Sequence, residues 1–321
     1  MIMTHSDNEE LHTNMIQGEI MIDINELSKL CERLGCRITP ECSLSDYITF
    51  RFGGPCRALI SVNSAKSAAE LIRYMKANGI KYGILGRGSN VLVSDDGYDG
   101  VILLFGSDFS HMEINGNTIK CDAGVLLASA CVRAQQLGLT GMENLFGIPG
   151  TVGGALYMNA GAYGSEMKDV VISAEYIDQN CEIRTISKDD MQLSYRQSFF
   201  SGTTNVITSV TLELKSGNLD DIKKAMSECM AKRSSKQPLE YPSAGSTFKR
   251  PEGSYASLLI DQCGLKGLTC GGAMVSEKHS GFVINKGYAT CADVLELCDK
   301  VKTIVKEKTG YQLELEPVIL Q

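Results

Sequence analysis

The chain has 321 residues, of which 43% are hydrophobic, and it carries a formal net charge of −7 at pH 7. This length predicts two or three domains, and the acidic balance argues against nucleic acid as the main partner. No apolar run reaches the roughly 18 residues of a membrane span, and the polar N-terminus lacks the features of a signal peptide, so we expect a cytoplasmic protein without membrane contact.

Predicted helices and strands alternate along the chain, which indicates an α+β fold. The polar residues 1–18 are expected to be frayed, and the apolar spacing over 20–35 predicts a helix that ends at its last glycine. Residues 58–86 predict a strand, a helix capped by Ser64 and stopped by Gly79, and a second strand. Further along, the pattern predicts strands within 90–122, a helix over 124–137, strands within 170–215, helices over 219–233 and 291–308, and a last strand over 311–320.

Twelve cysteines are scattered along the chain without a C-x-x-C pair. Neither a zinc site nor a disulfide framework is therefore indicated. In a reducing compartment we expect these side chains to pack as small core hydrophobes, and we predict no metal site.

Two glycine-rich loops indicate a bound nucleotide. The first, GILGRGSN (83–90), follows a predicted strand, and its closely spaced N–H groups, hydroxyl and amide can surround a phosphate. Its spacing is not G-x-G-x-x-G and a strand follows it, so a Rossmann site is not expected. The second, GIPGTVGGALYMNAGAYG (147–164), is too apolar for a flexible linker and suits backbone packed against a large, flat ligand. Together they favour a dinucleotide held by β-rich structure.

A basic segment surrounds Ser246. Residues 222–250 hold seven cations and two anions in an otherwise acidic protein, which suits a small anionic ligand, although part of this charge is the solvated face of a helix. Ser246 lies in SAGSTFK (243–249), which lacks the G-x-S-x-G pattern of hydrolase nucleophiles. Its local sequence alone is typical of a turn serine.

Six sequence blocks, taken in order, resemble the UDP-N-acetylenolpyruvoylglucosamine reductase family, the flavoenzymes that complete UDP-N-acetylmuramic acid for bacterial peptidoglycan. The resemblance extends from about residue 40 to the C-terminus. The blocks are TFRFGGP (49–55), GRGSNVLVSDDGYDG (86–100), GIPGTVGGALYMNAGAYG (147–164), YRQSFF (195–200), PSAGSTFKRP (242–251) and SEKHSGFVINKG (276–287).

The resemblance implies the fold of that family in its shorter form. Two α+β subdomains of the vanillyl-alcohol-oxidase type would bind FAD non-covalently, and a C-terminal α+β domain would bind the substrate. The implied segments are a polar tail over 1–18, a first FAD-binding subdomain over 19–105 to which the strand 311–321 returns, a second over 106–217, and the substrate-binding domain over 218–310.

The resemblance also implies the ligands and the residues that contact them. NADPH would be the reductant, FAD the cofactor, and the UDP-sugar UDP-N-acetylglucosamine enolpyruvate the substrate. The residues expected to bind FAD are Gly86, Arg87, Gly88, Ser89, Asn90, Gly147, Ile148, Gly150, Thr151, Gly153, Gly154, Asn159, Gly161 and Ala162. Those expected to bind the substrate are Tyr195, Lys232, Gln237 and Lys249.

Three positions match the family's catalytic residues. Arg196, in the Tyr-Arg pair, would stabilise negative charge on the substrate, and Ser246 would donate a proton to C2. The family's C-terminal glutamate matches Glu316 when counted from Gly310, or Glu314 when the Glu-Pro pair is aligned, and we prefer Glu316. If protonated, this carboxyl would help to polarise the enolate; if ionised, it would orient the arginine or a water molecule.

Two other functions stay open at this point. Another non-covalent FAD-dependent sugar or alcohol oxidoreductase would share the fold, and a non-enzymatic nucleotide-binding module would share the loops. FAD tethered through a histidine is disfavoured because no histidine lies between His12 and His111. We expect His279 to pack or to contact a ligand rather than to act as an acid, and we expect a monomer or a weak oligomer.

Overall fold

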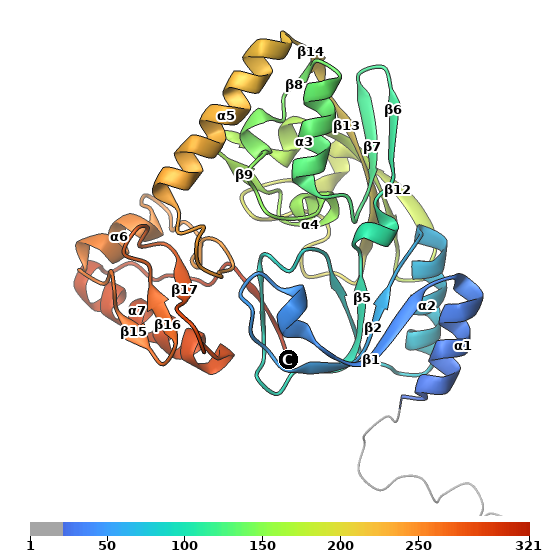
Figure 1. Ribbon diagram of the computed structural model, residues 1–321, viewed down its shortest axis with the longest axis horizontal. Coiled ribbons are helices and arrows are strands. Elements are labelled where there is room, and N and C mark those ends of the chain that lie inside the picture. The colour runs from blue at the N-terminus through green and yellow to red at the C-terminus, as the bar shows by residue number, and fades with distance from the viewer. Residues whose placement is uncertain (1–21) are drawn as a thin grey trace, which may run out of the picture.

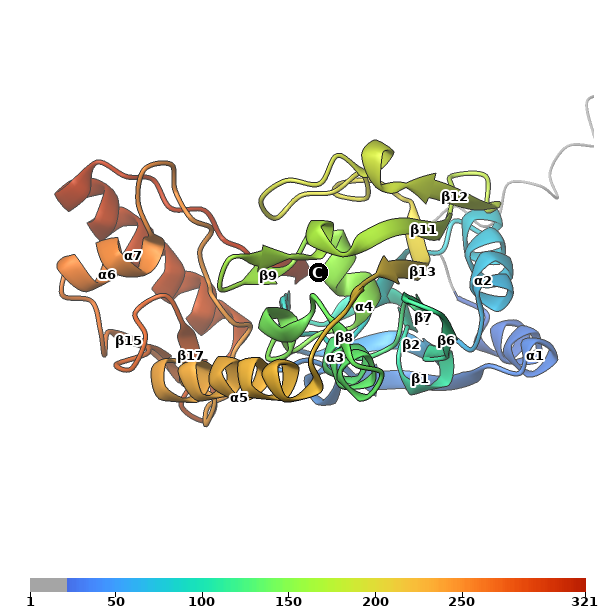
Figure 2. The same ribbon diagram turned by 90° about the horizontal axis from the view of Figure 1, so that it is seen from above.

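The chain folds into three bodies, as Figures 1 and 2 show. The computed structural model describes residues 22–321, so the tail expected over 1–18 lies outside the described residues. An N-terminal body (blue) lies below a middle body (green to yellow) in Figure 1, and a C-terminal body (orange to red) lies beside both. No helix within 22–321 is long and apolar enough to cross a membrane.

The N-terminal body is a four-stranded sheet with two helices packed beside it (Figure 1). Its strand order is β1-β2-β5-β3, in which β1 and β2 are antiparallel and the other neighbours are parallel. Asp23 and Ser64 cap the two helices with their side chains, and Gly35 ends the first helix at a φ of 66°. The elements are α1 (Ile24–Leu34), β1 (Arg37–Ser43), β2 (Pro55–Ser61), α2 (Ala65–Ala77), β3 (Tyr82–Leu85) and β5 (Tyr98–Leu104).

The middle body is built on a five-stranded antiparallel sheet of order β12-β11-β13-β7-β6. The short helix α4 packs against β13 and β7, and α3 lies against α4. One buried apolar cluster joins this body to α1 and α2. The elements are β6 (Met112–Asn115), β7 (Thr118–Asp122), α3 (Leu127–Gln136), β8 (Leu139–Thr140), α4 (Val152–Tyr157), β9 (Gly161–Ala162), β10 (Ser165–Glu166), β11 (Val171–Ile177), β12 (Ile183–Ser187), β13 (Val206–Glu213) and β14 (Lys215–Ser216).

Helix α5 (Leu219–Lys236) leads from the middle body to the C-terminal body and runs along one side of the molecule in Figure 2. In the C-terminal body, the antiparallel sheet β15-β16-β17 packs against the long helix α7, and α6 packs on the same helix. The elements are α6 (Ala256–Gln262), β15 (Thr269–Cys270), β16 (Ala273–Val275), β17 (Val283–Asn285) and α7 (Cys291–Thr309).

Three features tie the C-terminal body to the N-terminal body. The last strand, β18 (Val318–Leu320), pairs in parallel with β4 (Val91–Val93). Just after β4, the Asp95 carboxylate accepts hydrogen bonds of 2.7 and 2.9 Å from the first two N–H groups of α7. A second buried apolar cluster contains side chains of both bodies. The two bodies are therefore packed as one unit.

Replacing Asp95 by alanine is expected to lower the free energy of unfolding by about 1 kcal/mol, because a carboxylate that caps a helix start contributes about that much. Thermal unfolding measures the effect, and Asp96→Ala is the matched control, since its neighbouring exposed side chain makes no cap bond. Equal midpoints for both variants would show that the Asp95 cap contributes nothing to stability.

The structure confirms the predicted helices, with ends that differ by a few residues, and corrects two expectations. The second glycine-rich loop contains the helix α4, and the side chain of Thr151 caps the start of this helix. The last strand is confined to β18, because residues 311–317 run along the C-terminal body, where Leu315 forms only an isolated bridge with Phe248. The expectation for the cysteines is confirmed: all twelve are free thiols and eleven are buried.

Candidate functional site

The two glycine-rich loops lie against each other, although about 60 residues separate them in the sequence. A Cβ atom added at Gly86 would lie 2.5 Å from Thr151 Oγ1, and one added at Gly150 would lie 3.6 Å from Ser89 Oγ. Real Cβ atoms do not approach other atoms to 2.5 Å, so Gly86 has no room for a side chain. A glycine of each loop therefore packs against a hydroxyl side chain of the other loop.

The first loop is held in shape from both sides. Gly88 has a φ of 64°, and a Cβ atom there would collide with the backbone oxygen of Tyr47. The N–H of Thr49 donates to the Gly88 carbonyl at 3.1 Å. On the other side, the Asn90 amide donates to the backbone carbonyl of Glu316 at 3.2 Å. The loop is thus rigid and lies next to the C-terminal segment that carries the predicted catalytic glutamate.

Arg196 lies at the tip of a tight turn that follows β12. Ser194 and Gln197 close this turn with reciprocal backbone hydrogen bonds of 3.1 and 3.2 Å. Arg196 has a φ of 56°, an unfavourable backbone conformation for a residue other than glycine, of a kind that clusters at functional sites. Its Nε donates to Oε1 of Glu316 at 2.7 Å, and the two side chains are only 19% and 11% exposed.

Asn159 fastens this turn to the second glycine-rich loop. The side chain is fully buried, and its amide donates to the Ser194 carbonyl at 3.0 Å and to the Glu166 carboxylate at 2.9 Å. Its side-chain oxygen accepts from the N–H of Lys168 at 2.9 Å. The amide therefore holds protein groups in place, so a contact between Asn159 and FAD would use the backbone. The sequence pattern gave no signal for this positioning role.

The segment of Ser246 is hydrogen-bonded to the segment of Glu316 through the next residue in the chain. Gly245, with a φ of 74°, turns the chain into Ser246, and the next residue, Thr247, accepts a hydrogen bond of 3.0 Å on its carbonyl from the Glu316 N–H. Ser246 is half-buried. The fold therefore brings the segments of Arg196, Ser246 and Glu316 together from the middle body, the C-terminal body and the C-terminal strand region.

The two candidate glutamates differ sharply in their surroundings. The side chain of Glu314 is 71% exposed and makes a 3.4 Å contact with Lys249. Glu316 is nearly buried and pairs with Arg196. Burial raises the pKa of the Glu316 carboxyl above its ordinary value, and the attraction of Arg196 opposes this rise. These surroundings favour Glu316 as the residue with a chemical role.

The C-terminal end of α5 carries two buried polar atoms that have no partner among residues 22–321: Nε of Arg233 and Oε1 of Gln237. Arg233 lies against Gly147 so closely that a Cβ atom there would collide with its side chain. The guanidinium therefore lies beside the second glycine-rich loop, where an anionic ligand would satisfy it. Lys232, by contrast, is exposed. Arg233 is one of the seven cations of 222–250, but the sequence does not single it out, because helical phase decides which cation faces the loop.

Tyr195 connects the Arg196 turn to the C-terminal body. The guanidinium carbons of Arg196 and Arg250 lie 5.0 and 5.5 Å from the centroid of the Tyr195 ring. The Tyr195 hydroxyl accepts a hydrogen bond of 3.0 Å from the backbone N–H of Arg250. Arg250 also stacks on Tyr255 at 4.7 Å. Tyr195 is therefore flanked by two cations at the junction of two bodies.

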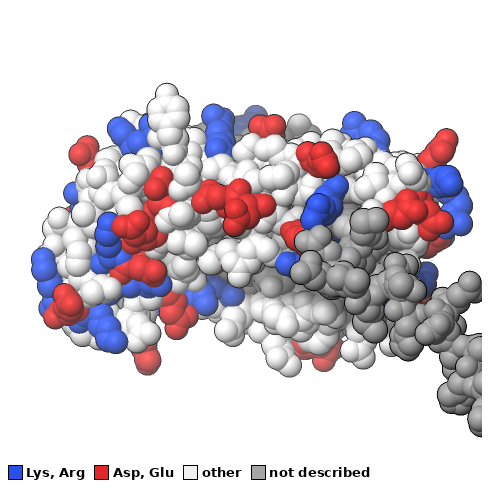
Figure 3. Space-filling view, turned by 90° about the horizontal axis from the view of Figure 1, so that it is seen from below, with Lys and Arg blue, Asp and Glu red and all other residues white. Residues whose placement is uncertain are grey.

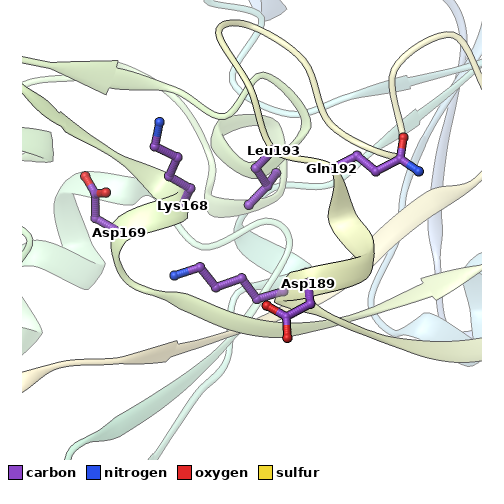
Figure 4. A pocket seen from close by; sticks show the side chains of 6 residues that line it. Lys168, Asp169, Asp189, Gln192 and Leu193 are labelled. Atoms are coloured by element: carbon purple, nitrogen blue, oxygen red, sulfur yellow. The ribbon is translucent and has the colours of Figure 1, made fainter.

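Two open hollows lie outside this constellation. One hollow has a volume of about 360 Å³ and is shown in Figure 4. Two lysines, two aspartates, Gln192 and Leu193 line it, and none of them is a predicted site residue. The other, of about 280 Å³, includes Tyr47, whose carbonyl abuts the first glycine-rich loop. Neither hollow is lined by a residue of the two glycine-rich loops, so neither carries an assignment.

Models of two known protein domains match this chain, one in its first two bodies and one in its C-terminal body. An FAD binding domain model matches residues 56–187, and a model of the C-terminal domain of UDP-N-acetylenolpyruvoylglucosamine reductase matches residues 237–320. The UDP-N-acetylenolpyruvoylglucosamine reductase of Clostridium perfringens (strain SM101 / Type A) is 44% identical over 283 residues, which cover 88% of this chain and 93% of that protein. This chain belongs to the UDP-N-acetylenolpyruvoylglucosamine reductase family.

Two further relatives agree with this membership. The reductase of Clostridioides difficile (strain 630) is 43% identical over 277 residues, which cover 86% of this chain and 91% of that protein. The crystal structure of UDP-N-acetylenolpyruvylglucosamine reductase from Thermus caldophilus has a TM-score of 0.76 and 34% identity, covering 89% of this chain and 99% of that chain. The expected fold, an FAD-binding module followed by a C-terminal α+β domain, is confirmed. The chain is a flavin-dependent oxidoreductase with FAD as its cofactor.

Replacing Gly88 by alanine is expected to weaken FAD binding by about tenfold or more, because the loop must shift away from Tyr47 and a left-handed backbone costs alanine about 1–2 kcal/mol. Fluorescence titration of the apoprotein with FAD measures the change. Gly116→Ala is the matched control, since Gly116 also has a positive φ, 57°, but lies in open space at a remote hairpin. Equal FAD affinities in both variants would contradict a role of this loop in holding the cofactor.

Proposed function

We propose that this protein reduces the enolpyruvyl ether of UDP-N-acetylglucosamine enolpyruvate to UDP-N-acetylmuramate, with FAD as cofactor and NADPH as reductant. The observation that carries the proposal is the buried Arg196–Glu316 pair, which joins two bodies beside the glycine-rich loops. FAD held by the two glycine-rich loops would supply the hydride for C3 of the enolpyruvyl group, with NADPH as the source of that hydride. The remaining chemistry falls to side chains of this chain.

The residues of the two loops fit FAD. The absence of side chains at Gly86 and Gly88 lets Thr151 and the Tyr47 backbone pack against 86–90 and fixes its shape, and its closely spaced backbone N–H groups suit a pyrophosphate. The apolar second loop suits the isoalloxazine ring over 150–162. The buried Nε of Arg233, which has no partner among residues 22–321, lies beside Gly147, and its guanidinium would supply a positive charge for a phosphate group of a bound ligand.

Arg196 is proposed to stabilise the negative charge that builds on C2 and its carboxylate when C3 accepts the hydride. A planar guanidinium matches a carboxylate, and it stabilises a transition state best when it is already oriented. The tight turn, the bond from Asn159 to Ser194 and the ion pair with Glu316 provide this orientation.

Ser246 is proposed to donate the proton that C2 receives. A carbanion is a strong base, so a weakly acidic hydroxyl can protonate it without an activating histidine, provided that the two groups lie within hydrogen-bond reach. The hydroxyl then recovers its proton from solvent. The hydrogen bond from the Glu316 N–H to the Thr247 carbonyl supports this role, because it ties the Ser246 segment to the residue that pairs with Arg196.

Glu316 is proposed to act as a neutral acid in the substrate complex. A substrate carboxylate that approaches Arg196 places a second negative charge near Glu316, and like charge raises a carboxyl pKa that burial has already raised. The protonated carboxyl can then donate a hydrogen bond to the enolate carboxylate. In the free protein the same group keeps the guanidinium in place.

Tyr195, Lys232, Gln237 and Lys249 are proposed to bind the UDP part of the substrate, together with Arg233. The 3.4 Å contact of Lys249 with the exposed Glu314 is weak enough for that lysine to change partner. Basic and acidic side chains alternate on the face shown in Figure 3, which differs from the continuous basic surface of nucleic-acid-binding proteins. We propose that the protein works in the cytoplasm as a monomer or weak oligomer.

The test of this function is NADPH oxidation by the purified, FAD-loaded protein. We expect oxidation only when UDP-N-acetylglucosamine enolpyruvate is present, in a one-to-one ratio, and a product that mass spectrometry shows to contain two additional hydrogens. Oxidation of a free sugar or alcohol by oxygen, without NADPH consumption, would instead indicate an oxidase of the same fold. A protein that binds FAD but catalyses neither reaction would be a binding module.

A further inference from the structure

Thr247, which follows Ser246 in the chain, is held at three atoms. Its N–H donates to the Gly281 carbonyl at 2.8 Å, its Oγ1 accepts from the Val283 N–H at 2.9 Å, and its carbonyl accepts from the Glu316 N–H at 3.0 Å. The residue is 2% exposed. The peptide that carries Ser246 is therefore fixed between the segment 281–283 and the segment of Glu316.

His279 supports one side of this arrangement, in the turn between β16 and β17. Its Nδ1 accepts a hydrogen bond of 3.1 Å from the Gly281 N–H, and its own N–H donates to Ser276 Oγ at 3.3 Å. The ring meets Phe282 edge-on with centroids 5.0 Å apart. A Cβ atom on Gly281 would lie only 3.1 Å from the imidazole, so the ring fills the space that this glycine leaves.

The imidazole is suited to accept this bond in its neutral form. Burial is the largest effect and lowers the pKa of His279; a hydrogen bond with its own backbone opposes this, and the charges of Lys266 and Lys236 add to the lowering. A neutral ring that accepts at Nδ1 carries its proton on Nε2. The Gly281 N–H is thus satisfied by a side chain, in a half-buried place where an unpaired donor would be costly.

We propose that His279 is a positioning residue for Ser246. By accepting a hydrogen bond from the Gly281 N–H, it fixes Gly281, whose carbonyl in turn accepts from the Thr247 N–H. This support orients the Ser246 hydroxyl. This inference rests on the proposed function, in which Ser246 donates the proton to C2. A misplacement of about 1 Å can cost about a hundredfold in rate, so the loss of this support should slow proton transfer without disturbing the FAD site.

The test compares three variants of the FAD-loaded protein by stopped-flow absorbance. His279→Phe keeps the ring and removes the acceptor, His279→Asn places an amide oxygen near the position of Nδ1, and His111→Asn changes an exposed histidine of the middle body. Reduction of bound flavin by NADPH and its reoxidation by substrate are measured separately, the latter in H₂O and D₂O. Thermal unfolding confirms that each variant is folded.

We expect His279→Phe to slow reoxidation about tenfold or more, to increase its solvent isotope effect, and to leave flavin reduction unchanged. His279→Asn should recover most of the wild-type rate, and His111→Asn should match the wild type. Equal rates in His279→Phe and wild type, equal losses in both half-reactions, or an asparagine variant as slow as phenylalanine would each overturn the inference. Ser246→Ala, run alongside, separates the two claims: normal reoxidation in that variant would refute the role of Ser246 itself.

Discussion

Replacing Ser246 by alanine is expected to slow reoxidation of the flavin by substrate about 10²–10⁴-fold and to leave its reduction by NADPH unchanged. The reason is that the variant removes the proton for C2 but alters neither the glycine-rich loops nor the Arg196–Glu316 pair. Single-turnover absorbance measurements of the two half-reactions give the result directly. Turnover then becomes limited by proton transfer, so the isotope effect in D₂O should change as well.

Two further serine variants control this experiment. Ser246→Cys keeps a donor proton at the same position and should retain more activity than alanine. Ser227→Ala removes an exposed hydroxyl from α5 that donates only to the Lys223 carbonyl within the helix, and it should behave as wild type. If Ser246→Ala slowed both half-reactions equally, Ser246 would support the site as a whole and would not be the proton donor.

Replacing Glu316 by alanine is expected to lower the rate of reoxidation about 10²–10³-fold, because the variant removes a preorganised donor and the partner that orients Arg196. Glu316→Gln should lose less, since its amide still offers a neutral N–H donor of similar shape. Glu314→Gln is the matched control, because the Glu314 side chain is exposed and its carboxylate makes one weak contact, with Lys249, among the described residues. Rates in saturating substrate measure all three.

The pH dependence of the Glu316 variants follows from the direction of its pKa. A raised pKa means that the neutral carboxyl persists to a higher pH than it would in water, so the active form is present at low pH and is lost as pH rises through that value. The wild-type rate of reoxidation should therefore fall on the alkaline side, and Glu316→Gln should lack that fall. A glutamine variant as slow as alanine, or a wild-type rate that rises with pH, would instead assign the ionised carboxylate.

Much of the fold could be predicted from the sequence because its signals are local. Gly35 adopts the positive φ of a helix end, and Ser64 caps the start of α2, as the pattern of residues predicted. Helix α4 was missed because the glycines around it have low helix propensity, and packing against β13 stabilises it instead. The pairing of β18 with β4 joins residues more than 200 positions apart, which no local pattern reveals.

The site was only partly predictable, for a similar reason. Family motifs selected Arg196, Ser246 and Glu316, and the structure places their segments together, while their catalytic roles stay proposals. Burial distinguishes Glu316 from Glu314. This burial depends on contact with Arg196, which lies 120 residues earlier in the sequence. The choice of Arg233 rather than Lys232 as the cation facing Gly147 depends on how α5 is rotated against the second loop.

The most direct measurement is a crystal structure of the Ser246→Ala variant with FAD and UDP-N-acetylglucosamine enolpyruvate bound, since slow turnover should preserve the substrate. We predict that the flavin ring lies along the second glycine-rich loop, with C3 of the enolpyruvyl group facing the ring. Its carboxylate should contact Arg196 and Glu316, and C2 should lie next to residue 246. A flavin bound elsewhere, or an enolpyruvyl group remote from these three positions, would contradict the proposed site.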